Sequence, residues 1–227
     1  MNAESNRTIS GMLITNPNGD CIAINNSKNI SIKNSEIGPC QGEGVSILSS
    51  SEISITQNRI EDVRTAVYVV SSQTTYMSHN QFLNVQGPMP RGQFVQFNQV
   101  SGPGNRINYN DGKNILGQSF SEDAINLFKS GGVSDDPLQI LGNRIIGGGP
   151  SDSGGGNMAG DRGGSHIIVK KNILVDPGQY GIAIAGGFNI QLLDNKIYAR
   201  KQFFTNVGLY VWAQPASNPV PCGNITV

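Results

Sequence analysis

The stretch that decides the fold is Asp20-Cys-Ile-Ala-Ile-Asn-Asn-Ser-Lys-Asn-Ile-Ser-Ile-Lys-Asn-Ser-Glu-Ile37, because its pattern returns directly afterwards. The second copy is Glu43-Gly-Val-Ser-Ile-Leu-Ser-Ser-Ser-Glu-Ile-Ser-Ile-Thr-Gln-Asn-Arg-Ile60. Apolar residues of the two copies correspond at a spacing of 23 positions: Ile22, Ile24, Ile30, Ile32 and Ile37 with Val45, Ile47, Ile53, Ile55 and Ile60. Each copy alternates apolar and polar residues between Ser/Asn-rich turns, which is typical of short β-strands with one buried face.

A repeat of roughly 20–50 residues built from such strands predicts a solenoid, in which each unit buries its apolar face against the next. The first strand of each unit can be followed at residues 22–24, 45–47, 67–69, 125–127, 182–184 and 209–211. Two segments, 93–97 and 157–161, fit less regularly: the parity of the first is ambiguous, and the second has few apolar residues. We therefore predict an all-β fold, a parallel β-helix of about eight coils with roughly 22–38 residues per coil.

A column of polar residues accompanies the repeat. Each member stands two positions before an apolar residue that closes a strand: Ser35, Asn58, Asn80, Asn105, Asn143, Asn172 and Asn195. Stacked amide side chains hydrogen-bond to one another and to turn backbone, so the column predicts a structural asparagine ladder.

Composition limits the classes of protein that fit. Charged residues make up 14% of the 227-residue chain and the net charge is zero, so there is no basic surface typical of nucleic-acid binding. No apolar run approaches the roughly 18 residues of a membrane span. We expect residues 1–227 to form a single β-helix domain excised from a longer chain with flanking segments, because neither end carries the polar cap that a solenoid needs.

The three cysteines are too few for a disulfide scaffold. Cys21 and Cys40 can meet between neighbouring coils, but spacing alone does not establish a bridge. We therefore expect Cys21 and Cys40 to be unpaired thiols, and the sequence leaves the state of Cys222 open.

Three connections are long in the middle of the chain, at residues 83–91, 108–122 and 146–156. Long loops on a regular scaffold commonly build a functional site. Insertions tolerated by a drifted solenoid explain the same lengths, so both interpretations stay open.

Two motifs stand on adjacent coils, Gly19-Asp-Cys-Ile-Ala-Ile24 and Gly42-Glu-Gly-Val-Ser-Ile47. They resemble the coils of polygalacturonase-type hydrolases, which read Gly-Asp-Asp-Cys-Ile-Ala-Ile and Gly-His-Gly-Val-Ser-Ile. Asp20 matches one aspartate of that family's catalytic pair, and Glu43 stands where the family has histidine. Over nearly its whole length the repeat resembles the wider pectate-lyase-like superfamily, which implies a right-handed parallel β-helix that acts on carbohydrate.

Acidic residues recur two positions before the first-strand apolar residues, at Asp20, Glu43 and Asp123. Stacked coils bring the backbones of Asp20 and Glu43 to about 5 Å, and neighbouring carboxylates raise the pKa of one partner, as glycosidic cleavage requires. These three are the predicted catalytic residues. Cations near the same edge are predicted to bind the carboxylates of an acidic polysaccharide: Arg64, Arg91 and Lys129. Solvated ion pairs at turns are the alternative.

The outward positions of the first strands carry aromatic side chains. These residues are predicted to contact sugar rings: Tyr68, Phe128, Tyr210 and Trp212. Cover by the long loops is the alternative explanation for the same pattern.

Acidic residues also stand in glycine-rich turns: Asp135, Asp136, Asp152 and Asp161. Oxygen ligands in flexible loops can hold Ca²⁺, but the spacing matches no defined motif, and aspartate also caps turn backbone. The three cysteines and two histidines are scattered, so we expect no tightly bound transition metal. We expect no cofactor, with Ca²⁺ as the alternative.

The leading hypothesis is a carbohydrate-active β-helix that cleaves or modifies an acidic, uronate-containing polysaccharide by hydrolysis, β-elimination or epimerisation. The alternative is a non-catalytic β-helix that serves as a glycan-binding, surface or structural module. The expected partner is a poly- or oligosaccharide, with no nucleic acid and no membrane. We expect an extracellular or periplasmic location, although the sequence shows no signal peptide.

Overall fold

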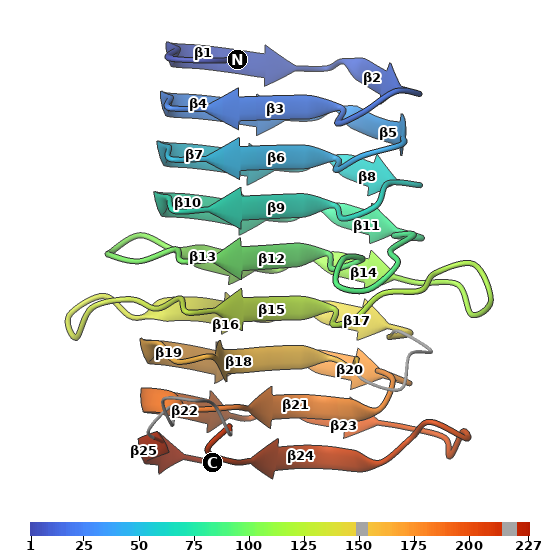
Figure 1. Cartoon of the computed structure of the whole chain (residues 1–227), viewed down its shortest axis with the longest axis vertical. Helices are drawn as coiled ribbons and strands as arrows, with labels where there is room; N and C mark the ends of the chain where they lie inside the picture. The colour runs from blue at the N-terminus through green and yellow to red at the C-terminus, as the bar shows by residue number, and fades with distance from the viewer. Residues whose placement is uncertain (149–153, 215–221) are drawn as a thin grey trace.

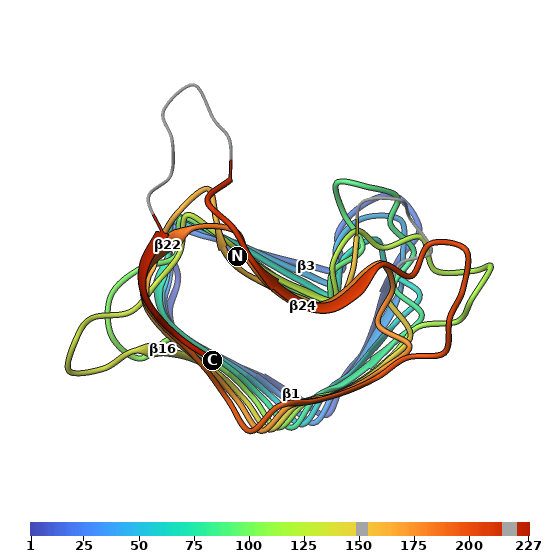
Figure 2. The same cartoon turned by 90° about the horizontal axis from the view of Figure 1, so that it is seen from below.

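The computed structural model describes residues 1–148, 154–214 and 222–227. These residues form 25 β-strands and no helix, so the described part of the chain has no helix that could cross a membrane. The strands assemble into three parallel sheets of nine, eight and eight strands, stacked coil upon coil along one axis (Figure 1). Viewed along that axis, the sheets are the walls of a tube and the loops project at its corners (Figure 2). The fold is the parallel β-helix that the repeat predicts.

Each coil contributes one strand to each wall. Sheet A consists of β3 (Ile22–Asn25), β6 (Val45–Leu48), β9 (Val67–Val70), β12 (Val95–Asn98), β15 (Ile125–Phe128), β18 (Asn157–Asp161), β21 (Tyr180–Ile184) and β24 (Val207–Val211). Sheet B consists of β1 (Ser5–Ser10), β4 (Lys28–Lys33), β7 (Ser51–Thr56), β10 (Gln73–Ser78), β13 (Arg106–Asn108), β16 (Leu138–Leu141), β19 (Ser165–Lys170), β22 (Gly187–Leu193) and β25 (Cys222–Thr226). Sheet C consists of β2 (Leu13–Asn16), β5 (Glu36–Cys40), β8 (Arg59–Glu61), β11 (Gln81–Leu83), β14 (Asp111–Lys113), β17 (Arg144–Ile146), β20 (Ile173–Val175) and β23 (Lys196–Tyr198).

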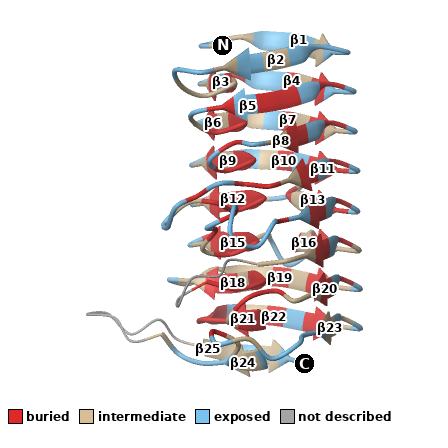
Figure 3. Ribbon diagram, turned by 90° about the vertical axis from the view of Figure 1, so that its right-hand side faces the viewer, coloured by how far each residue is buried: buried red, intermediate tan, exposed pale blue. Residues whose placement is uncertain are grey.

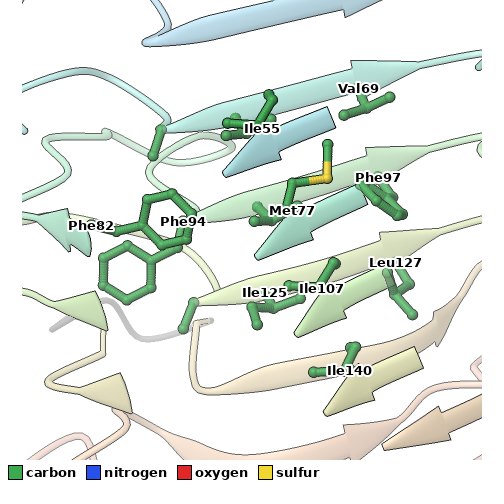
Figure 4. Close-up of a cluster of buried hydrophobic side chains, with 14 of the residues drawn as sticks. Ile55, Val69, Met77, Phe82, Phe94, Phe97, Ile107, Ile125, Leu127 and Ile140 are labelled. Atoms are coloured by element: carbon green, nitrogen blue, oxygen red, sulfur yellow. The ribbon is translucent and has the colours of Figure 1, made fainter. Parts of the chain in front are cut away.

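The core is the inside of the tube, filled by the apolar half of the alternating pattern. Sheet A aligns one inward residue from every coil in register: Ile22, Val45, Val67, Val95, Ile125, Asn157, Ile182 and Leu209. This register resolves the ambiguous segment 93–97, in which Val95 and Phe97 point inward and are fully buried. Buried side chains from the different walls meet in the middle coils (Figure 4), whereas β1 and β2 at one end are largely exposed (Figure 3).

The asparagine ladder exists, with one correction. The Oδ1 atom of each asparagine accepts a hydrogen bond from the backbone N–H of the preceding member. The series starts at the N–H of Ser35 and runs through Asn58, Asn80, Asn110, Asn143, Asn172 and Asn195. The member after Asn80 is Asn110, so the prediction of Asn105 was wrong. The amide of Asn105 instead accepts from the backbone N–H of Thr75, at the start of sheet B.

The misplacement has a packing cause. The sheet C strand that follows Asn110 presents Gly112 towards the core, so it lacks the apolar residue that marks the other coils. A Cβ atom at Gly112 would lie 2.5 Å from the ring of Phe94. Phe94 therefore occupies the missing side chain's place, and its ring stacks on Phe82 with centroids 5.7 Å apart (Figure 4).

The cysteine prediction was also wrong. Cys21 and Cys40 form a disulfide between neighbouring corners of the first coils, with Cα atoms 5.7 Å apart. Within the described residues Cys222 is a free thiol. The expected spacing between coils was compatible with this bridge, but the path of the chain around the corner decided it.

Asn157 offers a test of the core. It occupies a core position between Ile125 and Ile182, is fully buried, and has no hydrogen-bond partner among the described residues for either side-chain polar atom. We expect Asn157→Val to raise the free energy of unfolding by about 1–3 kcal/mol, because an unpaired buried polar group costs about that much. Urea unfolding followed by circular dichroism measures the change.

Asn143→Val is the matched control. The Asn143 amide donates to the Ile107 carbonyl and to Asn172 Oδ1, and it accepts from Asn110. The same substitution should therefore lower stability by about 2 kcal/mol or more. Equal destabilisation by both variants would show that Asn157 is not an unpaired group.

Candidate functional site

A pocket of about 260 Å³ opens on the outer face of sheet A, in the middle of the tube. Strands β9, β12, β15 and β18 form its floor, and two loops from sheet C into sheet A form its side wall, where they project beyond the sheet (Figure 2). Its lining residues are Tyr68, Pro90, Arg91, Gln96, Asn98, Glu122, Asn126, Phe128 and Asp161. The volume is near the lower end of the roughly 300–1,000 Å³ range of small-molecule sites.

The two wall loops are joined by backbone hydrogen bonds. The N–H of Glu122 donates to the carbonyl oxygen of Arg91 at 3.2 Å, and the N–H of Phe120 donates to the carbonyl oxygen of Gln86 at 3.2 Å. The two long loops therefore form one hydrogen-bonded wall, which places Arg91 and Glu122 at the pocket.

An amide network forms the floor. Gln96 Nε2 donates to Asn126 Oδ1 at 2.9 Å, and Asn126 Nδ2 donates to Asp123 Oδ2 at 2.7 Å and to Asp161 Oδ2 at 3.1 Å. One amide nitrogen therefore bridges two carboxylates, whose contacting oxygens are no farther apart than the sum of those two distances. Asn98 Nδ2 donates to the Tyr68 hydroxyl at 3.1 Å on the same floor.

Three carboxyl groups gather here in a poorly solvated environment. Burial raises the pKa of Glu122, and the negative charge of Asp161 raises it further, while Arg91 lowers it. Burial also raises the pKa of Asp161, against the lowering effect of Asn126, Arg162 and Gln214. Both carboxyl groups therefore favour the neutral form more than a solvated carboxyl group does, and each has neighbouring groups that oppose the effect of burial.

Asp123 lies behind the pocket wall rather than in its lining. It is 2% exposed, and burial raises its pKa to about 7 despite hydrogen bonds from Asn126 and Tyr180, with the charges of Glu122 and Asp161 acting in the same direction as burial. The Tyr180 hydroxyl donates to its Oδ1 atom, and the Gly155 N–H approaches the same atom at 3.3 Å. Its position suits a group that influences the pocket's charge without touching a ligand.

The position of Asp161 depends on a bulge in β18. Asn126 pairs with Met158, but Phe128 pairs with Asp161, so one extra residue lies in β18. Gly160 has φ of 67°, and a Cβ atom there would lie 2.0 Å from the Gly186 carbonyl oxygen. Only glycine fits this backbone, and the shift turns the carboxylate outward beside Phe128.

Arg91 is the cation in the pocket lining. Its guanidinium carbon lies 4.2 Å from the centre of the Tyr68 ring, and its Nε atom lies 3.6 Å from Glu43 Oε1. Arg64 donates to the same Glu43 oxygen at 3.0 Å. Glu43 is 2% exposed, so it is a buried counter-ion for two arginines and does not face the pocket.

The predicted acidic column is therefore divided by the structure. Asp20 Oδ1 accepts from the backbone N–H of Glu43 at 2.8 Å, just before β3, which is two strands away from β9 at the edge of the pocket floor. Asp20 and Glu43 hold a corner of the tube together, while Asp123 belongs to the carboxylate cluster. The predicted cation Arg64 accompanies Glu43.

The predicted binding residues are divided in the same way. Tyr68 and Phe128 line the pocket. Tyr210 lies on β24, with its ring edge-on to Tyr180 at 5.3 Å, and Trp212 is edge-on to Tyr210 at 6.1 Å. Burial and the charges of Asp123 and Asp161 raise the pKa of Tyr210 to about 12, so its hydroxyl lies within the electrostatic influence of these two carboxylates.

Lys129 lies outside the pocket. It borders a separate groove of about 630 Å³ at the corner between sheets A and B, lined by serine and glutamine side chains, and its Nζ atom is 5.4 Å from the Phe128 ring.

The residues considered for Ca²⁺ are dispersed. Asp136 pairs with Arg106, Asp161 lies in the pocket, and Asp152 is outside the described residues. Asp135 is exposed next to Ser134. Across residues 1–148, 154–214 and 222–227, no three or more His, Cys, Asp or Glu side chains are grouped to hold a metal ion.

Sequence reasoning did not select Glu122 or Gln96, and it assigned Asp161 only to possible Ca²⁺ binding. The signal for Glu122 was its place directly before Asp123, at the end of the long connection at residues 108–122. No local signal identified Asp161, because strict alternation along β18 would have placed Gly160 in the outward position.

Asp123→Asn tests the burial of this carboxyl group. Because the folded-state pKa of about 7 lies above the ordinary value of 3.8, the native protein binds more protons than the unfolded chain between these pH values. The Asp123 carboxyl group therefore leaves the free energy of unfolding unchanged below about pH 4 and lowers it by about a few kcal/mol above about pH 7. Between pH 5 and pH 8, the wild type should lose more unfolding free energy than Asp123→Asn. Identical pH slopes in urea unfolding would contradict this assignment.

Comparison with known proteins agrees with the architecture. The family model described as a right-handed β-helix region matches residues 1–222. A mutant of DFA-IIIase from Arthrobacter chlorophenolicus A6, solved in complex with DFA-III, superposes with a TM-score of 0.56 at 12% identity, covering 82% of this chain and 44% of that one. An alginate lyase from Paenibacillus sp. str. FPU-7 has a TM-score of 0.47 at 9% identity, covering 99% of both chains.

The chain thus spans less than half the length of DFA-IIIase. No curated protein sequence matches it. The family match covers all three sheets and nearly every coil, in agreement with the parallel strand order. The chain belongs to the right-handed β-helix family.

Proposed function

We propose that the protein is a glycan-cleaving β-helix whose active centre is the pocket on the outer face of sheet A. The observation that carries this proposal is the pair of partly buried carboxyl groups, Glu122 and Asp161, that line one pocket together with the aromatic residues Tyr68 and Phe128. Carbohydrate as the substrate class also follows the resemblance to pectate-lyase-like β-helices. The fold alone does not specify an activity.

Glu122 is the general acid in this proposal. Its pKa is raised by burial and by the charge of Asp161, which is the direction required of a group that gives its proton to the oxygen of the leaving sugar. Asp161 is the ionised partner. Its carboxylate accepts from Asn126 and supplies the negative charge that assists water in forming a new bond to the anomeric carbon, as the glycosidic C–O bond breaks and the leaving oxygen takes the proton of Glu122.

The rest of the lining binds and orients the sugar. The ring of Tyr68 is held between Arg91 and the amide of Asn98, so its orientation is set before a ligand arrives. Aromatic faces suit the C–H surface of a sugar ring, and neighbouring amides suit its hydroxyl groups. Asn126 keeps Asp161 in place and couples it to Asp123.

Hydrolysis is preferred to β-elimination or epimerisation within this proposal. Those reactions need a cation that neutralises a uronate carboxylate while a base removes the C5 proton. Arg91 is the cation of the pocket lining, and it is already opposed by Glu43.

A location outside the cytoplasm is part of the proposal. The disulfide between Cys21 and Cys40 favours an oxidising compartment, because such bonds rarely persist in the cytosol.

Glu122→Gln and Asp161→Asn test the active centre. Both substitutions keep the side-chain shape and remove acid–base chemistry, so each should lower the turnover of a cleaved glycan by about 10²–10⁴-fold. Reducing-end release from a panel of polysaccharides gives the rate, and the melting temperature should stay within a few degrees of wild type.

Glu52→Gln is the control, because Glu52 is an exposed carboxylate paired with Lys28 on sheet B, far from the pocket lining. It should keep full activity. If both pocket variants bind a glycan and wild-type protein also binds it without turnover, the protein is a glycan-binding module. Undiminished turnover in both pocket variants would place the active centre elsewhere.

A further inference from the structure

Charge in and around the pocket restricts its substrate. Glu122 and Asp161 line it, and Asp123 lies directly behind. On the cationic side, Arg91 faces Glu43, and Arg64 is bound to the same Glu43 carboxylate. Arg162 acts on Asp161 from the neighbouring position, outside the lining. Arg91 and Arg64 therefore share one carboxylate, and the carboxyl groups of this region, Glu43, Glu122, Asp123 and Asp161, outnumber its three arginines.

Solvation works in the same direction. Burial is the largest influence on all three clustered carboxyl groups and raises the pKa of each. An environment that disfavours ionisation of its own carboxyl groups also disfavours a further anion brought in by a ligand. Repulsion between like charges about 5–6 Å apart, with little water between them, lowers the binding constant of an anionic ligand by about a few-fold to a hundred-fold.

The hydrogen-bonding groups of the floor are uncharged. The side chains of Gln96, Asn98 and Asn126 bring amide groups, and Tyr68 brings a hydroxyl. Such groups pair with hydroxyls in either direction, because an amide both donates and accepts. Of the predicted cations, Arg91 lines the pocket but also faces Glu43, whereas Lys129 borders the serine-lined groove and not this pocket.

We infer that the sugar unit bound in this pocket is neutral, carrying hydroxyl groups and no carboxylate or sulfate. This inference rests on the proposed function and narrows it, because it replaces the uronate substrate expected from the sequence with a neutral glycan. Arg91 then serves to position Tyr68 and to moderate the raised pKa of Glu122, rather than to bind an anionic substrate.

Matched polymers test the inference. Polygalacturonate and alginate are each compared with their carboxyl-reduced forms, which keep the linkages and remove the charge. Neutral fructan, α-glucan and galactan complete the panel. Binding is measured by calorimetry, and cleavage by reducing-end release, at low and at high salt.

A neutral or carboxyl-reduced polymer should be bound and cleaved about tenfold or more in preference to any uronate polymer. Asp161→Asn removes the negative charge of the ionised partner, so it should reduce this preference in binding while abolishing turnover. The inference is overturned if a uronate polymer is preferred over its own carboxyl-reduced form. It is also overturned if none of the neutral polymers binds.

The two proposals fail differently. If a uronate polymer is preferred and Glu122→Gln and Asp161→Asn abolish its turnover, the active centre is correct and the substrate class is wrong. If a neutral polymer is preferred and both variants retain turnover, the proposed active centre is wrong, and the neutral preference arises at another site.

Discussion

Parallel, in-register pairing of successive coils is the constraint on which the rest of this molecule depends. Each strand shares its backbone hydrogen bonds with the strands above and below, and its inward side chains pack on the same columns. A slip of one residue would turn a whole apolar set outward. The ladder from Asn58 to Asn195 helps prevent such a slip, because each amide links the backbone of two neighbouring coils at a corner.

The candidate site exists where this regularity is locally broken. The extra residue at Gly160 turns Asp161 outward, and the loops that carry Arg91 and Glu122 leave the tube at one corner. Because the strands satisfy their own hydrogen bonds, additional residues can accumulate at the corners without disturbing the core. The regular floor of sheet A then holds the amides of Gln96 and Asn126 at fixed distances from those loops.

Placing several carboxyl groups in one poorly solvated region lowers stability, and the surrounding groups reduce that cost. Asn126 donates to two carboxylates, the Tyr180 hydroxyl donates to Asp123, and Arg91 lowers the pKa of Glu122. Arg91 itself is held by Glu43. The acidic residues of one sequence column thus have two purposes: some hold a corner together, and Asp123 sets the charge of the cluster.

Sequence alone determined the parallel β-helix, the inward columns and the outward aromatic positions. These are local properties, since period-two alternation and a repeat of 22–23 residues can be read in a short window. The prediction also selected Tyr68, Arg91, Asp123 and Phe128, which the structure brings together around one pocket.

Only the tertiary structure decided the remaining features. Asn110, and not Asn105, belongs to the ladder. The strand after Asn110 lacks an apolar side chain because Phe94, which directly precedes β12, fills the space beside Gly112. The bridge between Cys21 and Cys40 depended on the path of the chain around a corner. The approach of Glu122, Asp123 and Asp161 required a bulge and a loop path that no local pattern contains, since Asn126 reaches Asp161 across 35 residues of sequence and Tyr180 reaches Asp123 across 57. Contacts over such separations are set by how the coils stack, and alternation within one strand carries no information about them.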